Sequence, residues 1–331
     1  MAIDFSQLKK ILIIRLSSLG DVLLTTPLIR SIKKRNPSIQ IDFIVRDEFF
    51  EAVKNNPNLN HIYKYVNQKL DKHTLLNSLI SKNYNLVIDL QNNFRSKEIV
   101  RLLNCKVLTF KKNNLKKFLL VHFKINRLKE SPQIPVRYAE ATGINELDHE
   151  GIDFYTENTP DTRLNKNENY IGLCPGAKHF TKRWPKEYFI ELGNKLESAD
   201  YRVVLFGGPE ESSICYDIKS ALKNALNLCS TSLLQVGANM KMCKAIYTND
   251  SGLMHLASAV GVPVIAFFGS TVKEFGFYPY KARSIELENK NLSCRPCTHI
   301  GRKSCPKIHF KCMQEIKPEL AFSSLTNPVL Q

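Results

Sequence analysis

The sequence predicts an α/β protein with two doubly wound, Rossmann-like domains in tandem. Short apolar runs rich in β-branched residues alternate with amphipathic helical patterns, which favours right-handed βαβ units and parallel sheets. The alternation lapses once, around residues 155–168, and then starts again. The chain has 331 residues, of which 43% are hydrophobic, enough for two separate domain cores.

The first predicted domain spans residues 1–160. Its strands are near-continuous apolar runs, as in Ile11-Leu12-Ile13-Ile14, which suits strands buried on both faces of a sheet. Strands are expected at residues 10–15, 39–45, 61–66, 85–90 and 106–110. Helices are expected over residues 21–35, 48–55, 72–82 and 94–103.

The second predicted domain spans residues 161–313 and repeats the architecture. Strands are expected at residues 170–173, 202–206, 225–228, 244–248 and 262–268. Helices are expected over residues 185–198, 210–223, 232–242 and 251–260. Two such domains place a cleft between their sheets, where the carboxyl ends of both sets of strands face a shared ligand.

Composition narrows the class of protein. The longest apolar runs, such as residues 262–268, fall far short of the roughly 20 residues that span a bilayer. The start Met1-Ala2-Ile3-Asp4 lacks the basic and apolar pattern of a signal peptide. Nine cysteines in such a chain are expected to be mostly reduced. We expect a soluble cytoplasmic protein.

The net charge of +16 calls for an explanation. Residues 99–129 hold nine Lys and Arg and no acid, interleaved with Leu, Val and Phe. A basic amphipathic stretch of this kind binds anionic membrane surfaces or nucleic acid. The alternative is a solvated helix face without a partner.

The first strand ends in Arg15-Leu16-Ser17-Ser18-Leu19-Gly20-Asp21, and an amphipathic helix follows. A dinucleotide site would carry G-x-G-x-x-G here, and only Gly20 is present, which argues against an NAD or FAD enzyme. Asp21 stands at the strand's carboxyl edge, facing the expected cleft. It is either a reactive carboxylate or a helix cap.

Two loops of the second domain suit an anionic ligand. Lys182 lies in the loop before a predicted helix that begins at Pro185, because proline is favoured at the first position of a helix. Lys182 is either an anion ligand or a solvated lysine. Asn249-Asp250-Ser251-Gly252 leads from a strand directly into a helix, whose free amides favour a phosphate. His255, one turn further on, is either part of this site or a core histidine.

Two further loops follow strands at the same predicted edge. Gly207-Gly208-Pro209-Glu210-Glu211 places acids where they bind ribose hydroxyls or simply favour a helix start. Phe268-Gly269-Ser270-Thr271 is a second loop of small residues.

Together these motifs resemble glycosyltransferase family 9, the ADP-heptose:lipopolysaccharide heptosyltransferases. The resemblance runs in order from about residue 10 to about residue 313. It is carried by residues 16–23, 181–185, 249–255 and 268–271.

The resemblance implies a GT-B fold, with an acceptor domain, a nucleotide-sugar domain and a C-terminal segment (314–331) that returns toward the first domain. It implies inverting transfer of L-glycero-D-manno-heptose from ADP-heptose to Kdo or heptose on lipid A. The acceptor is thus an anionic glycolipid at the inner-membrane surface, and we expect no nucleic acid partner. The roles it implies are Asp21 as general base, Lys182 at the donor diphosphate, Asp250, Ser251, Gly252 and His255 at the start of the donor-site helix, and Arg95 in an acceptor loop. From their places at the strand ends we also expect Glu211, Ser270 and Thr271 in the donor site and Ser18 and Gly20 in the acceptor site.

The residue chemistry agrees with this assignment. A base takes the proton of the acceptor hydroxyl while charge grows on the departing ADP, where Lys182 and the amides of Ser251 and Gly252 would stabilise it. No Asp-x-Asp pair that holds Mg²⁺ is apparent at this site, so we expect no cofactor for catalysis.

A cysteine pattern near the C-terminus is Cys294-x₂-Cys297-x₇-Cys305-x₆-Cys312. Only the first pair has the close spacing of a zinc site. A structural zinc site, reduced packed thiols and a disulfide all remain open.

Two other functions fit parts of the sequence. One is a GT-B transferase or epimerase that uses another nucleotide sugar. The other is a non-enzymatic protein that binds membranes or nucleic acid, which would explain the charge but not the polar motifs at the strand ends.

Overall fold

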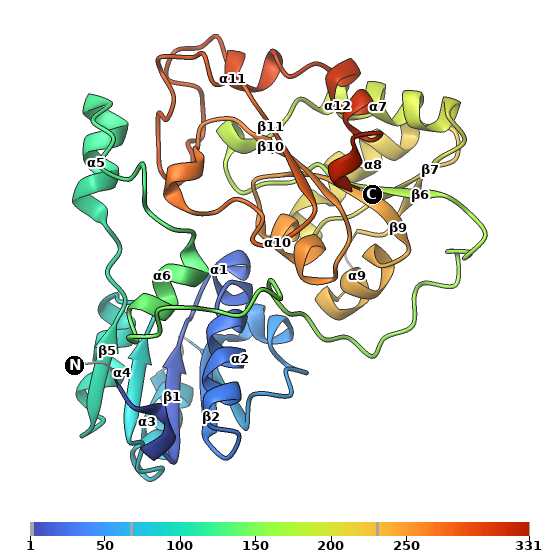
Figure 1. Cartoon of the computed structure of the whole chain (residues 1–331). Coiled ribbons are helices and arrows are strands. Elements are labelled where there is room, and N and C mark those ends of the chain that lie inside the picture. Colours follow the sequence, from blue (N-terminus) through green and yellow to red (C-terminus); the bar gives the residue numbers. More distant parts are fainter. Residues whose placement is uncertain (1–2, 67–68, 230–231, 331) are drawn as a thin grey trace. The chain divides into compact units, whose positions relative to one another are not determined.

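A computed structural model describes residues 3–66, 69–229 and 232–330 (Figure 1). The chain divides into two compact units. The first joins Met1–Lys112 with Pro132–Tyr155, and the second joins Asn113–Ser131 with Thr156–Gln331. Residues 113–131, which the sequence placed in the first domain, therefore group with the second unit.

The first unit contains a five-stranded parallel sheet in the order β3-β2-β1-β4-β5. The strands are β1 (Lys10–Ile14), β2 (Gln40–Arg46), β3 (His61–Tyr65), β4 (Leu86–Asp89) and β5 (Lys106–Thr109). All five were predicted. Its helices are α1 (Leu19–Leu23), α2 (Thr26–Arg35), α3 (Lys69–Ile80), α4 (Phe94–Arg101) and α6 (Ile134–Glu140), with short 3-10 turns η1 (Phe5–Gln7) and η2 (Asp47–Ala52).

Two helix predictions in this unit were wrong in detail. The helix expected over residues 21–35 is broken between α1 and α2 at Pro27, which lies in the first turn of α2 and has no amide hydrogen to donate to the preceding turn. The hydroxyls of Thr25 and Thr26 donate instead to the carbonyls of Val22 and Leu23, at 2.7 and 2.9 Å. Threonine hydroxyls compete in this way for helical backbone acceptors. The helix expected over residues 48–55 is the 3-10 turn η2.

The second unit contains a six-stranded parallel sheet in the order β11-β10-β9-β6-β7-β8. The strands are β6 (Tyr170–Cys174), β7 (Arg202–Leu205), β8 (Leu226–Asn227), β9 (Cys243–Asn249), β10 (Val264–Phe268) and β11 (Ser284–Glu288). Its helices are α5 (Asn114–Phe123), α7 (Lys186–Ser198), α8 (Ser212–Ala221), α9 (Leu233–Met240), α10 (Gly252–Ala259), α11 (Lys311–Gln314) and α12 (Pro318–Ser324), with 3-10 turns η3 (Phe180–Lys182), η4 (Pro209–Glu211), η5 (Lys273–Phe275) and η6 (Pro328–Leu330). The sequence predicted five of these strands and missed β11.

The C-terminal residues pack onto the second unit. Ile316 and Ala321 belong to its main apolar core, and Lys195 of α7 forms an ion pair with Glu319 of α12 at 3.1 Å. The indole nitrogen of Trp184 donates to the Ile316 carbonyl at 2.8 Å. The return of residues 314–331 toward the first domain stays a prediction.

Strand direction places both candidate sites. In each sheet all strands are parallel, so their carboxyl ends lie at one edge. The strand order reverses between β1 and β4 in the first unit and between β6 and β9 in the second. Such reversals leave a crevice beyond the carboxyl ends of the two strands, where ligands bind in doubly wound folds. Within the described residues, no helix combines the length and apolar character needed to cross a membrane.

Candidate functional site

Asp21 lies in the turn that follows β1, inside the first turn of α1. Its Oδ1 accepts from the Arg15 guanidinium at 2.7 Å, and its Oδ2 accepts from the Ser18 amide at 3.2 Å and the Ser18 hydroxyl at 2.9 Å. Asp21 therefore makes the hydrogen bonds of a helix cap, as one of the two interpretations of the sequence expected. The side chain keeps 18% of its surface exposed, whereas Arg15 keeps 8%.

The protonation of Asp21 follows from these contacts. Burial would raise the pKa of the Asp21 carboxyl, but the Arg15 charge and the hydrogen bonds from Ser18 outweigh burial and lower it. The carboxylate is thus ionised at neutral pH. Burial raises the pKa of the neighbouring Tyr138 hydroxyl, which stays protonated.

The end of β4 buttresses this turn. The side-chain oxygen of Gln91 accepts from the amides of Leu16 and Ser17 at 2.9 and 3.2 Å. Asp89, which is 1% exposed, accepts from the Ser96 hydroxyl at 2.8 Å. The Gln91 bonds hold the β1 and β4 loops together at the strand-order reversal, and the Asp89 bond fixes the segment between β4 and α4.

Of the predicted acceptor residues, the structure brings only Ser18 into direct contact with Asp21. Gly20 is buried in α1, next to Asp21 in the chain, and Arg95 is exposed on α4. Lys112 was missed as a site residue because it appeared as one of many lysines in a basic stretch. It is half-buried just beyond β5, and burial, helped by the charge of Arg15, lowers its pKa against the pull of Asp21 and Asp89.

In the second unit, the structure pairs Lys182 with Asp250. The Lys182 Nζ lies 2.8 Å from Asp250 Oδ2, which also accepts from the Thr271 hydroxyl at 2.7 Å. Asp250 is only 6% exposed, and the lysine keeps 18% of its side chain exposed. The aspartate thus positions Lys182 rather than meeting an anion itself.

The start of α10 supplies amide donors beside this pair. Ser251 is the N-cap of α10, and Gly252 is its first residue. The hydroxyl oxygens of Ser251 and Ser270 are buried without a hydrogen-bond partner among the described residues. His255 is 3% exposed within α10, as the core-histidine interpretation expects. Unsatisfied hydroxyls beside free helix amides fit an anionic ligand in place of water.

The side chain of Glu211 packs against Gly176 in the loop that follows β6. Its Oε2 accepts from the Gly208 amide at 2.8 Å. A β-carbon built on Gly176 would lie 2.1 Å from Glu211 Cγ, so only glycine leaves room for this side chain. Glu211 therefore lies over the loop that follows β6, close to the strand-order reversal.

The sequence did not identify two residues that hold the loops of this site together. Asn249 bridges two loops, because its Oδ1 accepts from the Trp184 amide and its Nδ2 donates to the Pro175 carbonyl, at 2.9 and 2.8 Å. Arg295 donates to the carbonyls of Gly269 and Thr271 at 2.6 and 2.7 Å and pairs with Glu288. No local pattern marks such long-range contacts.

The cysteine pattern shows one close contact. Cys294 Sγ lies 3.9 Å from His309 Nε2. No three His, Cys, Asp or Glu side chains of the described residues come together as a metal site requires. The nine cysteines are all free thiols. The structure therefore gives the zinc interpretation of Cys294, Cys297, Cys305 and Cys312 no support.

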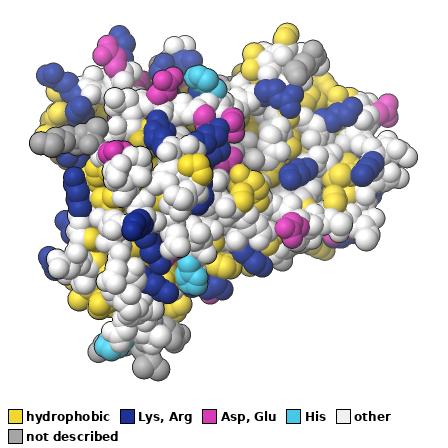
Figure 2. Space-filling view, turned by 60° about the horizontal axis from the view of Figure 1, so that its bottom comes forward, with side chains coloured by type: hydrophobic (Ala, Val, Ile, Leu, Met, Phe, Trp, Pro, Cys, Tyr) yellow, Lys and Arg dark blue, Asp and Glu magenta, His cyan; other side chains and the backbone are white. Residues whose placement is uncertain are grey.

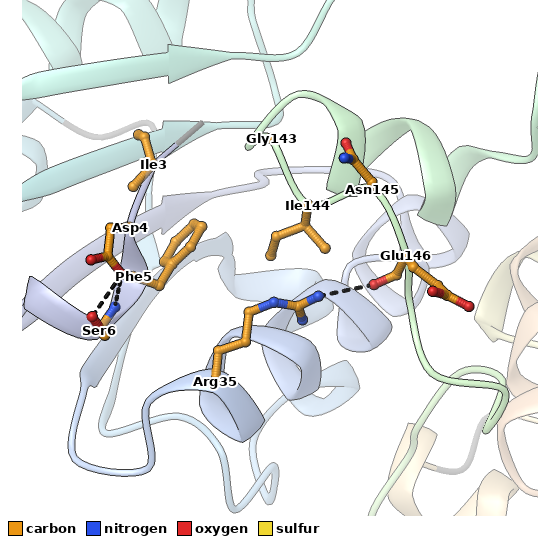
Figure 3. Close-up of a pocket in the computed structure, with 9 residues that line it drawn as sticks. All are labelled: Ile3, Asp4, Phe5, Ser6, Arg35, Gly143, Ile144, Asn145 and Glu146. Carbon is orange, nitrogen blue, oxygen red and sulfur yellow. Dashed lines mark hydrogen bonds between the residues drawn. The ribbon is translucent and has the colours of Figure 1, made fainter. Parts of the chain in front are cut away.

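A cavity of about 510 Å³ lies elsewhere in the first unit, and none of the predicted site residues lines it (Figure 3). It lies between residues 3–6, which precede β1, and residues 143–146, which follow α6. Arg35 donates to the Glu146 carbonyl there at 3.2 Å. The cavity is thus at the amino edge of β1, opposite the edge that carries Asp21.

Comparisons with known proteins agree on one family. Residues 72–308 match glycosyltransferase family 9 (heptosyltransferase). The chain is 33% identical over 171 residues to lipooligosaccharide heptosyltransferase 2 of Campylobacter jejuni, a match that covers 50% of this chain and 52% of that protein. It thus spans about half the length of that relative.

Two further comparisons cover more of both chains. The chain is 29% identical over 308 residues to lipopolysaccharide heptosyltransferase 2 of Escherichia coli, covering 84% of this chain and 88% of that protein. The solved structure of E. coli ADP-heptose lipopolysaccharide heptosyltransferase II superposes with a TM-score of 0.74 at 23% identity, over 97% of this chain and 98% of that one. The similarity to this solved structure confirms the predicted GT-B fold. The family match covers residues 72–308, which is most of the sequence. The chain belongs to glycosyltransferase family 9.

Proposed function

We propose that this protein transfers L-glycero-D-manno-heptose from ADP-heptose to the inner core of lipopolysaccharide, onto Kdo or heptose carried by lipid A. The observation that carries the proposal is Lys182, held by Asp250 beside the start of α10, in a chain of this family. The names of the relatives support the donor and the acceptor.

The second unit would bind the donor. Negative charge grows on the ADP diphosphate as the bond to the sugar breaks. Lys182 and the amides at Ser251 and Gly252 would stabilise that charge, with the hydroxyls of Ser270 and Thr271 beside them. Glu211 would bind the ribose hydroxyls, and His255 would support α10 from within. These groups require no metal ion for catalysis.

The first unit would bind the acceptor and supply the base. Asp21 would accept the proton of the attacking hydroxyl while ADP departs from the opposite side of the sugar, which inverts the anomeric centre in one step. Its lowered pKa keeps it ionised and ready to accept a proton at neutral pH. Ser18 and Gly20 would line the acceptor, and Arg95 would meet its acidic sugars or phosphates.

The acceptor is an anionic lipid, so we propose that the protein works in the cytoplasm at the face of the inner membrane. Another nucleotide-sugar transferase or an epimerase would share the fold and part of the donor site. The identity of the donor separates these alternatives.

The first test is a transfer assay. We expect incubation with ADP-heptose and Kdo-lipid A, or its monoheptosylated form, to add the mass of one heptose, as measured by mass spectrometry. UDP- and GDP-sugars should give no product, because the proposed donor site is specific for ADP-heptose. Transfer from another nucleotide sugar alone, or none from any donor, would contradict the proposed function.

The role of Asp21 is tested by Asp21→Asn. Turnover should fall at least about a hundredfold, the low end of what a positioned base contributes. ADP affinity, measured by calorimetry, should stay the same because the donor groups belong to the other unit. The matched control is Ser18→Ala, which removes one hydrogen bond to the carboxylate but keeps the base. If Asp21→Asn keeps near wild-type turnover, Asp21 is only a cap.

Gly176→Ala tests the placement of Glu211. The added methyl group would occupy the space of Glu211 Cγ and displace its carboxylate. We expect weaker binding of ADP, by about tenfold, with little change in kcat at saturating donor. Glu211→Gln should weaken ADP binding similarly if the carboxylate binds ribose. Unchanged ADP affinity in both variants would remove Glu211 from the donor site.

Metal dependence is tested with EDTA. We expect turnover to survive, since Lys182 and the α10 amides are proposed to neutralise the diphosphate. Circular dichroism recorded on the same sample separates loss of catalysis from loss of folding. Inactivation of a folded enzyme that Mg²⁺ or Mn²⁺ restores would refute this part of the mechanism.

A further inference from the structure

Helix α5 is attached to the second unit along one face. Its buried residues Leu120 and Val121 form an apolar cluster with Leu128 and with Phe275 of η5, and α5 lies beside η5 (Figure 1). At the end of the helix, Lys124 Nζ donates to the carbonyls of Cys294 and Pro296, at 3.1 and 2.7 Å. These contacts fix which side of α5 faces outward.

The outward face of α5 is apolar. Leu115, Phe118 and Phe123 are 71%, 49% and 62% exposed. They are three and five residues apart, so with the intervening Leu119 and His122 they form one stripe along the helix. The Phe118 ring packs on His122 and Phe123, with ring centres 4.5 and 5.9 Å apart. A stable water-exposed helix face is normally polar, so this stripe needs an occupant.

The stripe lies in a basic segment of the chain. Residues 99–129 contain no Asp or Glu, and Lys116, Arg127 and Lys129 are exposed. The face seen in Figure 2 shows basic side chains scattered among acidic, apolar and uncharged ones. A helix of ten residues is about 15 Å long, too short to span a bilayer, so it would lie in the membrane plane.

We propose that the outward face of α5 inserts shallowly into an anionic bilayer, with Leu115, Phe118 and Phe123 among the lipid chains and Lys116, Arg127 and Lys129 at the head groups. Amphipathic helices with basic and aromatic residues bind membrane interfaces in this way. A second copy of α5 in its place would bring like charges together, and nucleic acid would leave the apolar stripe in water. The proposal deepens the proposed function, because it names the surface that brings the enzyme to a lipid-linked acceptor.

Tryptophan fluorescence tests the insertion directly. The chain has one tryptophan, Trp184, which is 1% exposed and gives a constant background. With vesicles of phosphatidylglycerol and phosphatidylcholine, Phe118→Trp should shift its emission to shorter wavelength and be quenched by brominated acyl chains. The matched control is Tyr216→Trp on α8 of the same unit, 66% exposed, which should show neither effect. Equal responses from both reporters, or none from Phe118→Trp, would overturn the proposal.

A second experiment separates the apolar from the ionic contribution. Replacing Leu115, Phe118 and Phe123 together by Gln should weaken vesicle binding at least tenfold at every salt concentration. Replacing Lys116, Arg127 and Lys129 by Gln should weaken it mainly at low salt, because about half-molar salt screens the charges. Both variants should keep the wild-type circular dichroism and ADP affinity. Vesicle binding by the apolar variant equal to wild type would overturn the proposal.

Membrane docking is also distinguishable from self-association and from the transfer activity itself. A Phe118→Trp shift that grows with protein concentration without lipid would make the stripe a contact between copies and overturn the proposal. Vesicle binding is measured without substrates, so failure of the heptose assay alone would leave the docking surface intact and refute only the proposed function. Conversely, transfer to acceptor in detergent with no vesicle binding would refute the docking surface alone.

Discussion

The parallel direction of the strands is the constraint on which both candidate sites depend. Because β6 and β9 are adjacent and in register at Cys174 and Thr248, the loops that follow them must lie side by side. Asn249 then ties these loops together through the Trp184 amide and the Pro175 carbonyl. In the first unit Gln91 plays the same part between the β1 and β4 loops. Each site is thus built on backbone that the sheet has already positioned.

Each candidate site contains a cation–carboxylate pair, and the two pairs are arranged in opposite ways. In the pair Arg15–Asp21 the carboxylate is the more exposed partner, at 18% against 8%. In the pair Lys182–Asp250 the cation is the more exposed, at 18% against 6%. The buried partner in each pair holds the other in place and compensates its charge. The first unit therefore presents a negative group and the second a positive one, which is what a base and a diphosphate site require.

The strands were predictable from the sequence where short runs are rich in apolar and β-branched residues. Ten strands were found where such runs predicted them. The missed strand β11 alternates Ser, Glu and apolar residues at the edge of its sheet, where burial is incomplete. The helix over residues 21–35 breaks at Pro27, which starts α2 and leaves the preceding turn without an amide donor, and the apolar pattern alone runs through this proline.

The loops that carry the candidate sites were predictable from the sequence, but the hydrogen bonds and ion pairs between those loops were not. Loops at strand ends were visible because polar residues follow buried runs. The partner of Lys182 was not visible, because Asp250 is 68 residues away in the chain and no spacing rule connects them. Arg295 was missed for the same reason. Lys112 was assigned to a surface, although the sheet brings it near Asp21 and Asp89.

The cap and base roles of Asp21 are compatible. Oδ1 is held by a buried arginine, a charge-assisted bond that fixes the orientation of the carboxylate. Oδ2 is held by Ser18, which is exposed. On the proposed mechanism an acceptor hydroxyl would replace that of Ser18 at Oδ2 while Oδ1 stays fixed. Arg15 lowers the basicity of the carboxylate, but it also orients it before the acceptor arrives, and a base gains from correct placement as well as from its pKa.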